Sequence, residues 1–337
     1  MRSARRAGRR TNVALLSLLS LALATGVLAF AVGTLPAATA VAVTHGALGV
    51  GLLVLIPWKS FIVRRAQRRR TDRPGRVAGT ALGVLTVACV ASGLLHALAG
   101  YRLYGPVTAL QVHVGTALAL IPFLVAHVAA HPQRPRRADL SRRVLLRTAG
   151  LGTASLAAYG AVEGVSSLLG LPGARRRGTG SAEVGSGTPE LMPVTQWVSD
   201  PVPDLGGDHG LRIHGRNVRR AELDGTDELT AVLDCTGGWY AEQVWSGTRL
   251  NRLLGELPAD ASIDVVSVTG YRRRFPASDA AHLLLATRAG GALLSAGHGA
   301  PVRLVAPGRR GFWWVKWVAE VRVVDAPWWL QSPFPLQ

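Results

Sequence analysis

The sequence predicts an all-α transmembrane bundle in the first half of the chain and an α+β domain in the second half. Long apolar runs, in a chain that is 48% hydrophobic, are confined to residues 13–171. The formal charge of +18 is uneven, because residues 1–170 hold 20 basic and 3 acidic side chains, against 18 and 17 in the remainder. Arginine clusters between apolar runs differ from the basic surface of a folded nucleic-acid binder, so we expect no nucleic-acid partner.

Five apolar segments are long enough to cross a hydrocarbon core of roughly 30 Å at about 1.5 Å per residue. They cover residues 13–32, 40–63, 77–100, 107–130 and 144–171. The prediction is a basic N-terminus (1–12), a four-helix membrane domain (13–131) and a fifth transmembrane helix within 132–171. A cleaved signal peptide is the alternative for the first segment, but its length and the spans after it favour a membrane helix. We therefore expect a multi-pass protein of a bacterial plasma membrane, in contact with lipid.

The positions of the arginines predict the orientation. Basic side chains gather before the first span and in the links 64–76 and 132–147, whereas residues 33–43 have none and residues 101–106 have only Arg102. Cytoplasmic loops of membrane proteins collect arginine and lysine. We therefore expect a cytoplasmic N-terminus and place residues 172–337 outside the cytoplasm.

The link before the fifth span contains a possible export signal. Ser141 precedes the pair Arg142 and Arg143, and Val144-Leu145-Leu146 leads into a mildly apolar helix rich in glycine and alanine. This arrangement resembles a twin-arginine signal, and it predicts the twin-arginine export machinery as a partner. A simple charged stop is the alternative, since the positive-inside rule also supplies arginines here.

Histidines in the spans suggest a haem site. His45, His96 and His113 lie at similar depth near the outer ends of three helices. Ionisable side chains inside a membrane are candidates for function, and facing neutral imidazoles are ordinary axial ligands of b-type haem. His113 is the first ligand, with either His45 or His96 as its partner. An interhelix hydrogen bond is the alternative for each histidine alone.

His127 follows His113 by 14 residues, or about 21 Å on one helix face, a spacing that suits two stacked haems. Residues 40–131 resemble the di-haem membrane cytochromes b, and this resemblance implies electron exchange with quinone. Lys59, however, stands 14 residues after His45, where a second histidine would be expected. One haem b is therefore predicted. A second, using His127 with His131 or Lys59, stays open, and for His131 a structural role is preferred.

After a glycine- and serine-rich linker (172–190), residues 191–337 predict one strand-dominated domain. Short apolar runs bounded by Gly, Pro and Asp predict strands at 211–213, 229–233, 263–268, 302–305 and 315–324. Helical stretches are predicted at 248–255 and 278–288. The domain is long enough for one hydrophobic core.

The two cysteines lie in different parts of the chain. Cys89 falls in mid-membrane and Cys235 in the outer domain, so they cannot pair within one chain. Cys235 ends a predicted strand and enters the turn Thr236-Gly237-Gly238, which would bring its sulfur close to a large ligand. Thiolate is a soft metal ligand, whereas the alternative is an inert buried cysteine.

Residues Val194 to Asp325 resemble the molybdopterin-binding domain of the sulfite oxidase family. The most specific match is the segment from His298 to Trp317, with Cys235 at the position of the family's cysteine ligand to molybdenum. The resemblance implies an α+β fold, a molybdenum–molybdopterin cofactor and Cys235 as the catalytic metal ligand. The pterin phosphate needs cationic donors and close backbone approach. Predicted cofactor-binding residues are His298, Arg303, Gly308, Arg309, Arg310, Gly311 and Lys316.

Several side chains keep a plainer interpretation. Arg303 could be a solvated strand residue, and core packing is preferred for Trp313, Trp314 and Trp317. The run Arg272-Arg273-Arg274 could attract an anionic substrate, although a solvated charge run is preferred.

The departures from the family limit the substrate. Animal sulfite oxidases carry arginine and histidine where this chain has Trp313 and Trp314, and their upstream histidine-bearing segment is replaced here by residues 194–197. Their immunoglobulin-like domain is also missing, so sulfite is not indicated. The design is closer to the bacterial periplasmic methionine sulfoxide reductases, which use a separate haem membrane subunit.

The predicted function is a membrane-bound molybdenum oxidoreductase of the oxygen-atom-transfer type, acting on a small-molecule or protein sulfoxide or a related S- or N-oxide. It would exchange electrons with quinone through haem. The alternative is a non-enzymatic haem membrane anchor that carries a degenerate partner-binding domain.

Overall fold

The computed structural model describes residues 2–57, 59–60, 73–130, 132, 141–196, 201–205, 210–225 and 227–332. The chain forms two compact units, one of Met1–Phe30 with Leu35–Ala182 and the other of Ala31–Thr34 with Glu183–Gln337. The boundary after Ala182 falls within the predicted linker. Predictions for His131, Trp197 and most of the two arginine-rich links concern residues outside the described ranges.

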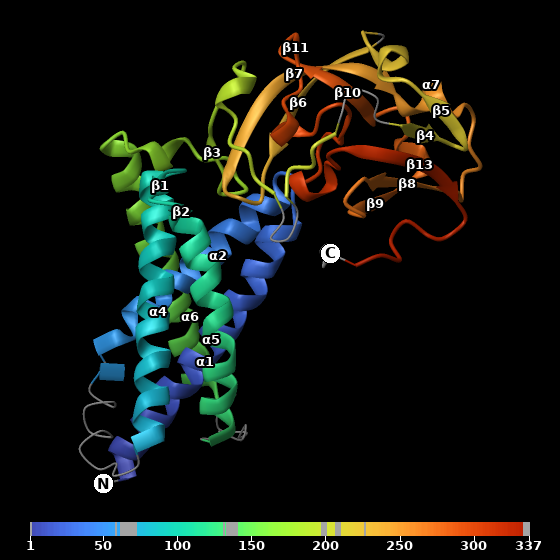
Figure 1. Cartoon of the computed structure of the whole chain (residues 1–337). Coiled ribbons are helices and arrows are strands. Elements are labelled where there is room, and N and C mark those ends of the chain that lie inside the picture. The colour runs from blue at the N-terminus through green and yellow to red at the C-terminus, as the bar shows by residue number, and fades with distance from the viewer. Residues whose placement is uncertain are drawn as a thin grey trace. The chain divides into compact units, whose positions relative to one another are not determined.

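The first unit is helical (Figure 1). Its helices are α1 (Arg2–Ala31), α2 (Ala37–Val54), α4 (Arg73–Ala99), α5 (Ala109–Ala130) and α6 (Arg142–Leu168). A small hairpin, β1 (Leu103–Tyr104) with β2 (Val107–Thr108), joins α4 to α5. The closest helix packing joins α4 with α5 and α2 with α6.

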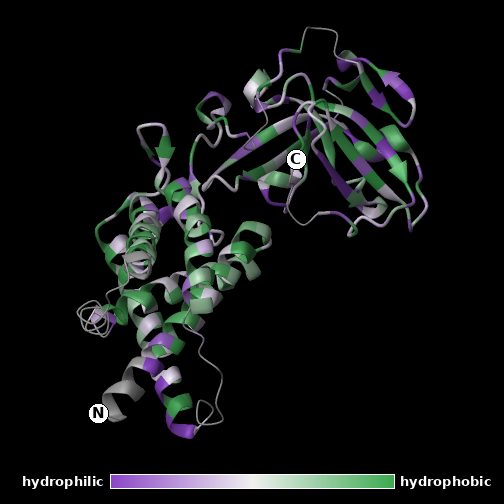
Figure 2. Ribbon diagram, turned by 60° about the horizontal axis from the view of Figure 1, so that its bottom comes forward, coloured by the Kyte–Doolittle hydropathy of each residue, from purple (hydrophilic) through white to green (hydrophobic). Residues whose placement is uncertain are grey.

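Four of these helices are long and apolar enough to cross a membrane: Arg9–Ala31, Ala37–Val54, Val77–Ala99 and Ala109–Ala130. In Figure 2 the ribbons of these helices are coloured mostly as hydrophobic residues. The prediction of five apolar spans is wrong for residues 144–171. These residues do form most of α6, but α6 carries Glu163, three arginines and several hydroxyl and glycine residues, so it is less apolar than the other four.

Helix α6 packs antiparallel against α2. The Tyr159 ring lies against Gly46, and Ser155 lies against Gly51 one turn further along. A Cβ atom at Gly46 would stand 2.3 Å from a Tyr159 ring carbon, so glycine is needed for this contact. The direction places the C-terminal end of α6 beside the N-terminal end of α2.

Residues after α6 pack onto the same end of the helical unit. The 3-10 helix η2 (Pro172–Arg175) contacts the end of α4, where Gly173 approaches the carbonyl of Ala97. Further on, Gly178 lies against Thr39 at the start of α2. This part of the predicted linker therefore has specific contacts with two helices.

The second unit is built from two sheets (Figure 1). The first contains β3 (Ala182–Glu183), β6 (Asp227–Asp234), β7 (Trp239–Arg249), β10 (Leu284–Ala289), β11 (Ala292–Leu293) and β12 (Arg303–Val305). The second contains β4 (Leu211–Ile213), β5 (Arg216–Val218), β8 (Ser262–Ser267), β9 (Arg272–Pro276) and β13 (Val318–Val324). The pairs β6–β7, β7–β10, β10–β11, β10–β12, β4–β5, β8–β9 and β8–β13 are antiparallel, whereas β4 and β13 are parallel.

The strand-dominated domain is confirmed, and so are predicted strands that correspond to β4, β6, β8, β12 and β13. Strand β13 begins at Val318, three residues later than predicted. A helix at 248–255 is confirmed only as the short α7 (Leu250–Leu254). The predicted helix at 278–288 is wrong, because residues 284–289 form β10, which is buried between β7 and β12.

Candidate functional site

Cys235 stands in the tight turn that links β6 to β7. Its backbone N–H donates to the carbonyl of Trp239 at 2.9 Å, and the Gly237 N–H donates to the Cys235 sulfur at 3.3 Å. Gly311 approaches from the opposite segment, where an added Cβ would lie 3.0 Å from the Cys235 Cα. Because Gly311 has no side chain, the backbone at Gly311 can pass directly beside Cys235.

A buried ion pair fastens these two segments together. An Arg310 Nη atom lies 2.5 Å from an Asp234 carboxylate oxygen, and both side chains are almost fully buried. Asp234 and Arg310 also form an isolated parallel bridge through their backbones. The ion pair thus partly offsets the Arg310 charge beside Cys235, and it holds the turn that carries Cys235 in place.

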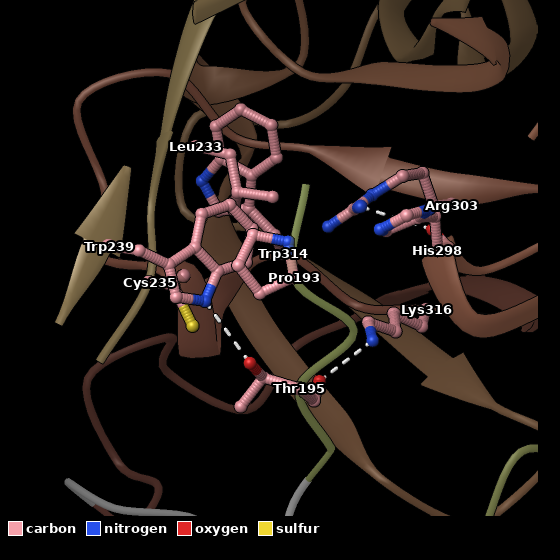
Figure 3. A pocket seen from close by; sticks show the side chains of 10 residues that line it. Pro193, Thr195, Leu233, Cys235, Trp239, His298, Arg303, Trp314 and Lys316 are labelled. Atoms are coloured by element: carbon pink, nitrogen blue, oxygen red, sulfur yellow. Dashed lines mark hydrogen bonds between the residues drawn. The ribbon is translucent and has the colours of Figure 1, made fainter. Parts of the chain in front are cut away.

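The Cys235 sulfur faces a cavity of about 50 Å³. Its lining is Pro193, Thr195, Leu233, Cys235, Trp239, His298, Arg303, Gly311, Trp314 and Lys316. Figure 3 shows Leu233 and Trp239 on the side of the sulfur, with Arg303 and Lys316 across from them. The site therefore combines one soft ligand, an aromatic wall and two cations.

Arg303, the first residue of β12, is only 1% exposed. Its guanidinium stacks over Trp245 and Trp314, at 5.0 and 5.6 Å from the ring centroids, and donates to the carbonyl of His298. Among the described residues, its Nε has no hydrogen-bond partner. Burial lowers the pKa of Arg303 to about 10, so it remains charged at neutral pH.

Lys316 and Thr195 organise the opposite rim. The Lys316 ammonium donates to the carbonyls of Thr195 and Gly297 at 2.8 and 2.7 Å, and Trp239 Nε1 donates to the Thr195 hydroxyl at 3.1 Å. Carbonyl oxygens carry no formal charge, so these hydrogen bonds do not neutralise the ammonium group. Lys316 therefore adds a second positive charge to the cavity wall.

Two titratable side chains of the cavity respond to this environment. Burial raises the pKa of the Cys235 thiol, while the Gly237 N–H and the charges of Arg310 and Lys316 oppose the rise. Burial, with the charges of Arg303 and Lys316, lowers the pKa of His298. His298 hydrogen-bonds Ser295 and the carbonyl of Met192, so it is held as a neutral imidazole.

The structure brings five predicted site residues together around one cavity, namely Cys235, His298, Arg303, Gly311 and Lys316. Arg310 supports the cavity from behind through Asp234. Gly308 and Arg309 do not line it: Gly308 forms a turn with φ +74°, and Arg309 pairs with Asp279 at 2.8 Å and stacks over Trp313.

Sequence reasoning missed Thr195 and Trp239 as cavity residues and assigned Trp314 to core packing. Trp314 lines the cavity and supports Arg303. Trp314 lies far from Cys235 and Trp239 in the sequence, so their meeting at one cavity could not be predicted.

The preferred interpretation of residues 272–274 as a solvated charge run is wrong for Arg273. Its side chain is 2% exposed, stacks over Phe312 and Trp313, and donates to the carbonyl of Ser332 at 2.7 Å. Arg273 therefore holds the C-terminal segment against β9, while Arg272 is exposed.

In the helical unit, His45 of α2 and His113 of α5 lie side by side. Their ring centroids are 5.8 Å apart and their planes nearly perpendicular. Each Nδ1 hydrogen-bonds a backbone carbonyl, of Ala22 for His45 at 3.0 Å and of Cys89 for His113 at 2.7 Å. In these bonds Nδ1–H is the donor, so each Nε2 carries a lone pair available for a metal.

The other helical histidines are placed differently. His96 uses its Nε2 toward the carbonyl of Gly180, at 3.3 Å, so its ring is engaged by the segment after α6. His127 is half-buried on α5, four turns from His113. Lys59 donates to Asn12 of α1 at 3.0 Å. Of the two partners considered for His113, the structure brings His45 against it.

Both sites suit the predicted groups by their donors. A metal bonded to one nitrogen of each imidazole at about 2.0 Å would hold the ring centroids roughly 6 Å apart, close to the His45–His113 separation. At the cavity, one thiol stands among cations that would offset an anionic cofactor. Within the described ranges, no three His, Cys, Asp or Glu side chains form a metal-binding group.

Comparison with known proteins finds a family model that matches part of the chain. Residues 201–330 match the family model described as the oxidoreductase molybdopterin binding domain. This molybdopterin-binding domain contains Cys235, His298, Arg303, Gly311 and Lys316, and the match supports a molybdopterin-dependent oxidoreductase.

The crystal structure of the sulfane dehydrogenase SoxCD from Paracoccus pantotrophus is similar to part of the chain, with 25% identity and a TM-score of 0.35. The similarity covers 37% of this chain and 41% of that one. No curated protein matches the sequence.

Proposed function

We propose that the chain is a membrane-bound molybdenum oxidoreductase of the oxygen-atom-transfer type, which exchanges electrons with quinone through a b-type haem. The observation that carries this proposal is the Cys235 sulfur in a cation-lined cavity inside the matched segment 201–330. The molybdenum cofactor would supply the two-electron chemistry.

The residues of the cavity would have separate roles toward that cofactor. Cys235 would ligate molybdenum as a thiolate, losing the proton that burial otherwise favours. Arg303 and Lys316 would offset the negative charge of the pterin and its phosphate. Gly311 would keep the approach to the sulfur open, because a side chain there would press on the Cys235 backbone.

In the helical unit, His45 and His113 would hold one haem, with their tautomers fixed by the carbonyls of Ala22 and Cys89. Such a group carries electrons singly, as exchange between a two-electron site and a quinone requires. A second haem near His127 remains a hypothesis with no second described histidine at that end of the helices.

The orientation follows from the charges. Helix α6 runs antiparallel to α2, and residues 172–178 pack at the end where α2 begins and α4 ends. Helices α4 and α6 begin with Arg73 and Arg142 at the opposite end. We propose a cytoplasmic N-terminus and an extracytoplasmic molybdopterin-binding domain. Because the four apolar helices alone would return the chain to the cytoplasmic side, this topology requires the less apolar α6 to cross the membrane as well, delivered by the twin-arginine machinery through Arg142 and Arg143.

The proposed substrate is a sulfoxide or a related S- or N-oxide, free or within a protein. What supports this class is the apolar part of the cavity wall, because Leu233, Trp239 and Trp314 offer apolar contact to a substituent on the sulfur or nitrogen.

The test is dye-linked turnover with reduced viologen and a panel of S- and N-oxides, using full-length protein in detergent. Cys235→Ala should abolish turnover and change the molybdenum signal in electron paramagnetic resonance. The matched control Cys89→Ala, in the other unit, should retain dye-linked activity. Full turnover in Cys235→Ala would exclude the metal site, and wild-type protein without molybdenum would favour the non-enzymatic anchor instead.

A further inference from the structure

We propose that Tyr159, Glu163 and Arg176 form the binding site for the quinone headgroup, and that the Glu163 carboxylate exchanges its protons. The inference rests on the proposed function and names the site of its membrane partner. One residue motivates it. Among the described residues up to Ala182, Glu163 has the only acidic side chain. If α6 crosses the membrane, as the proposed topology requires, an ionisable side chain within it is costly and is a candidate for function.

The three side chains form a compact polar cluster. Arg176 Nη2 lies 2.7 Å from Glu163 Oε1, and Arg176 Nε donates to the carbonyl of Gly173 at 2.8 Å. Tyr159 lies four residues, or about one turn, before Glu163 on α6. A quinone headgroup has two carbonyl oxygens that accept hydrogen bonds, and its reduced form has two hydroxyls that donate them. The cluster offers both complements, because Arg176 and Tyr159 donate and Glu163 accepts.

The cluster also adjoins the proposed electron carrier. The Tyr159 ring packs directly on Gly46, the residue that follows His45. A headgroup bound against Tyr159 would therefore lie beside the helix turn that carries one of the two imidazole ligands. Proximity matters because each electron must pass between the headgroup and the group held by His45 and His113.

Helix geometry gives the cluster access to lipid. Leu156, Tyr159 and Glu163 lie at positions i, i+3 and i+7, which share one helix face. Ser155 and Ser166 mark the buried side of α6, at 3% and 1% exposure, whereas Leu156 is 53% exposed. Glu163 is one-third exposed and stands at the border between these sides. An isoprenoid tail can thus follow Leu156 while its headgroup reaches Glu163.

Water reaches the cluster from the other direction. Glu163 lies five residues, or about 7.5 Å along the axis, before the end of α6 at Leu168. Arg176 belongs to the segment that follows this end. A proton on Glu163 therefore has a short path to the aqueous face from which residues 172–178 emerge.

The chemistry balances in either direction. Oxidation of a hydroquinone breaks two O–H bonds and releases two protons and two electrons. The electrons would leave one at a time to the haem held by His45 and His113, while Glu163 accepts each proton in turn and passes it to water. Quinone reduction is the same sequence reversed, with Glu163 as proton donor. Arg176 would hold the headgroup oxygen beside the Glu163 carboxylate.

A simpler role for the Glu163–Arg176 ion pair is to hold the residues after α6 against that helix. The following variants distinguish this structural role from a role in quinone binding. Glu163→Gln keeps a hydrogen-bond acceptor for Arg176 but cannot exchange a proton. Arg176→Gln removes the charged donor, and Arg175→Gln is its matched control, because Arg175 is adjacent but exposed. Two quantities are measured on full-length protein: haem reduction by a short-chain quinol in stopped flow, and binding of the fluorescent quinol analogue 2-heptyl-4-hydroxyquinoline N-oxide.

Glu163→Gln should slow haem reduction by about 100-fold, the usual worth of a positioned acid–base group, while analogue binding changes by less than about threefold. Glu163→Asp should recover part of the rate. Arg176→Gln should weaken analogue binding by about tenfold, and Arg175→Gln should match the wild type.

Wild-type rates in Glu163→Gln, or loss of the haem spectrum in that variant, would overturn the inference and leave the pair a structural role. Equal effects of Arg175→Gln and Arg176→Gln would do the same. Wild-type protein that contains no haem would instead refute the proposed function itself.

Discussion

Arg303 is the residue whose burial is hardest to explain without a ligand. It is fully buried, its guanidinium lies over two indole rings that also contact each other, and no carboxylate among the described residues pairs with it. A buried charge without a partner destabilises the fold, so an anionic ligand is the natural compensation. The same reasoning does not apply to Arg309, which is partly exposed and paired with Asp279.

The variant Arg303→Met should therefore lose bound molybdenum cofactor without unfolding. Loss of the hydrogen bond to the His298 carbonyl costs about 1 kcal/mol, and relief from burying a charge offsets it, so the melting temperature of cofactor-free protein should change by no more than about 5 °C. Arg309→Met is the control and should retain molybdenum. Metal analysis with thermal unfolding checks both. A variant that keeps its full molybdenum content would show that Arg303 does not hold the cofactor.

Single residues differed in how far the sequence could place them. Cys235, Arg303 and Lys316 were predictable because a cysteine in a glycine turn and a lone lysine in the second half are conspicuous. Trp314, Trp239 and Thr195 were not, since their common position depends on segments more than 40 residues apart meeting at one cavity. Arg273 was misjudged because its aromatic and carbonyl partners lie near the C-terminal end of the chain.

At the scale of elements, apolar alternation found short strands but not the longest one. Strand β7 buries Trp239, Ala241, Gln243 and Trp245 on one face, and the polar Gln243 obscures that pattern. Gln243 is buried because its amide donates to the carbonyl of Gly185. The leucines of β10 resemble a helix in sequence, yet pairing with β7 and β12 decides their conformation.

Helix α1 and helix α4 are expected to determine which histidines bind haem, because they supply the carbonyls that hold His45 and His113. His45→Ala and His113→Ala should each remove the haem absorbance. His96→Ala should retain it, since His96 is engaged by Gly180. Optical spectra of purified variants check this. Haem loss in His96→Ala with retention in His45→Ala would reverse the assignment.

Helix α6 begins with the arginine pair proposed to direct export. Replacing Arg142 and Arg143 by lysine preserves the charge but removes the guanidinium groups. A reporter enzyme fused after Gln337 should then lose its extracytoplasmic activity, while the earlier helices remain membrane-inserted in fractionation. Normal export of this double variant would leave the pair a charged stop.

At the scale of the whole molecule, the proposed function gives one chain two electron-handling sites, so a variant should be able to disable one and leave the other intact. His113→Ala should stop turnover with a quinol but leave dye-linked turnover intact, because a small dye reaches the molybdenum site directly. Parallel assays with both reductants check this. Equal loss of both activities would mean that the helical unit has no separate electron-carrying role.

The central claim is that this one chain binds both molybdenum and haem. The most direct measurement is the molybdenum and haem content of full-length protein purified from membranes, relative to the amount of chain. The account predicts one molybdenum and at least one b-type haem per chain, with molybdenum lost in Cys235→Ala and haem retained there. Protein that is folded and membrane-inserted but contains neither group would contradict it.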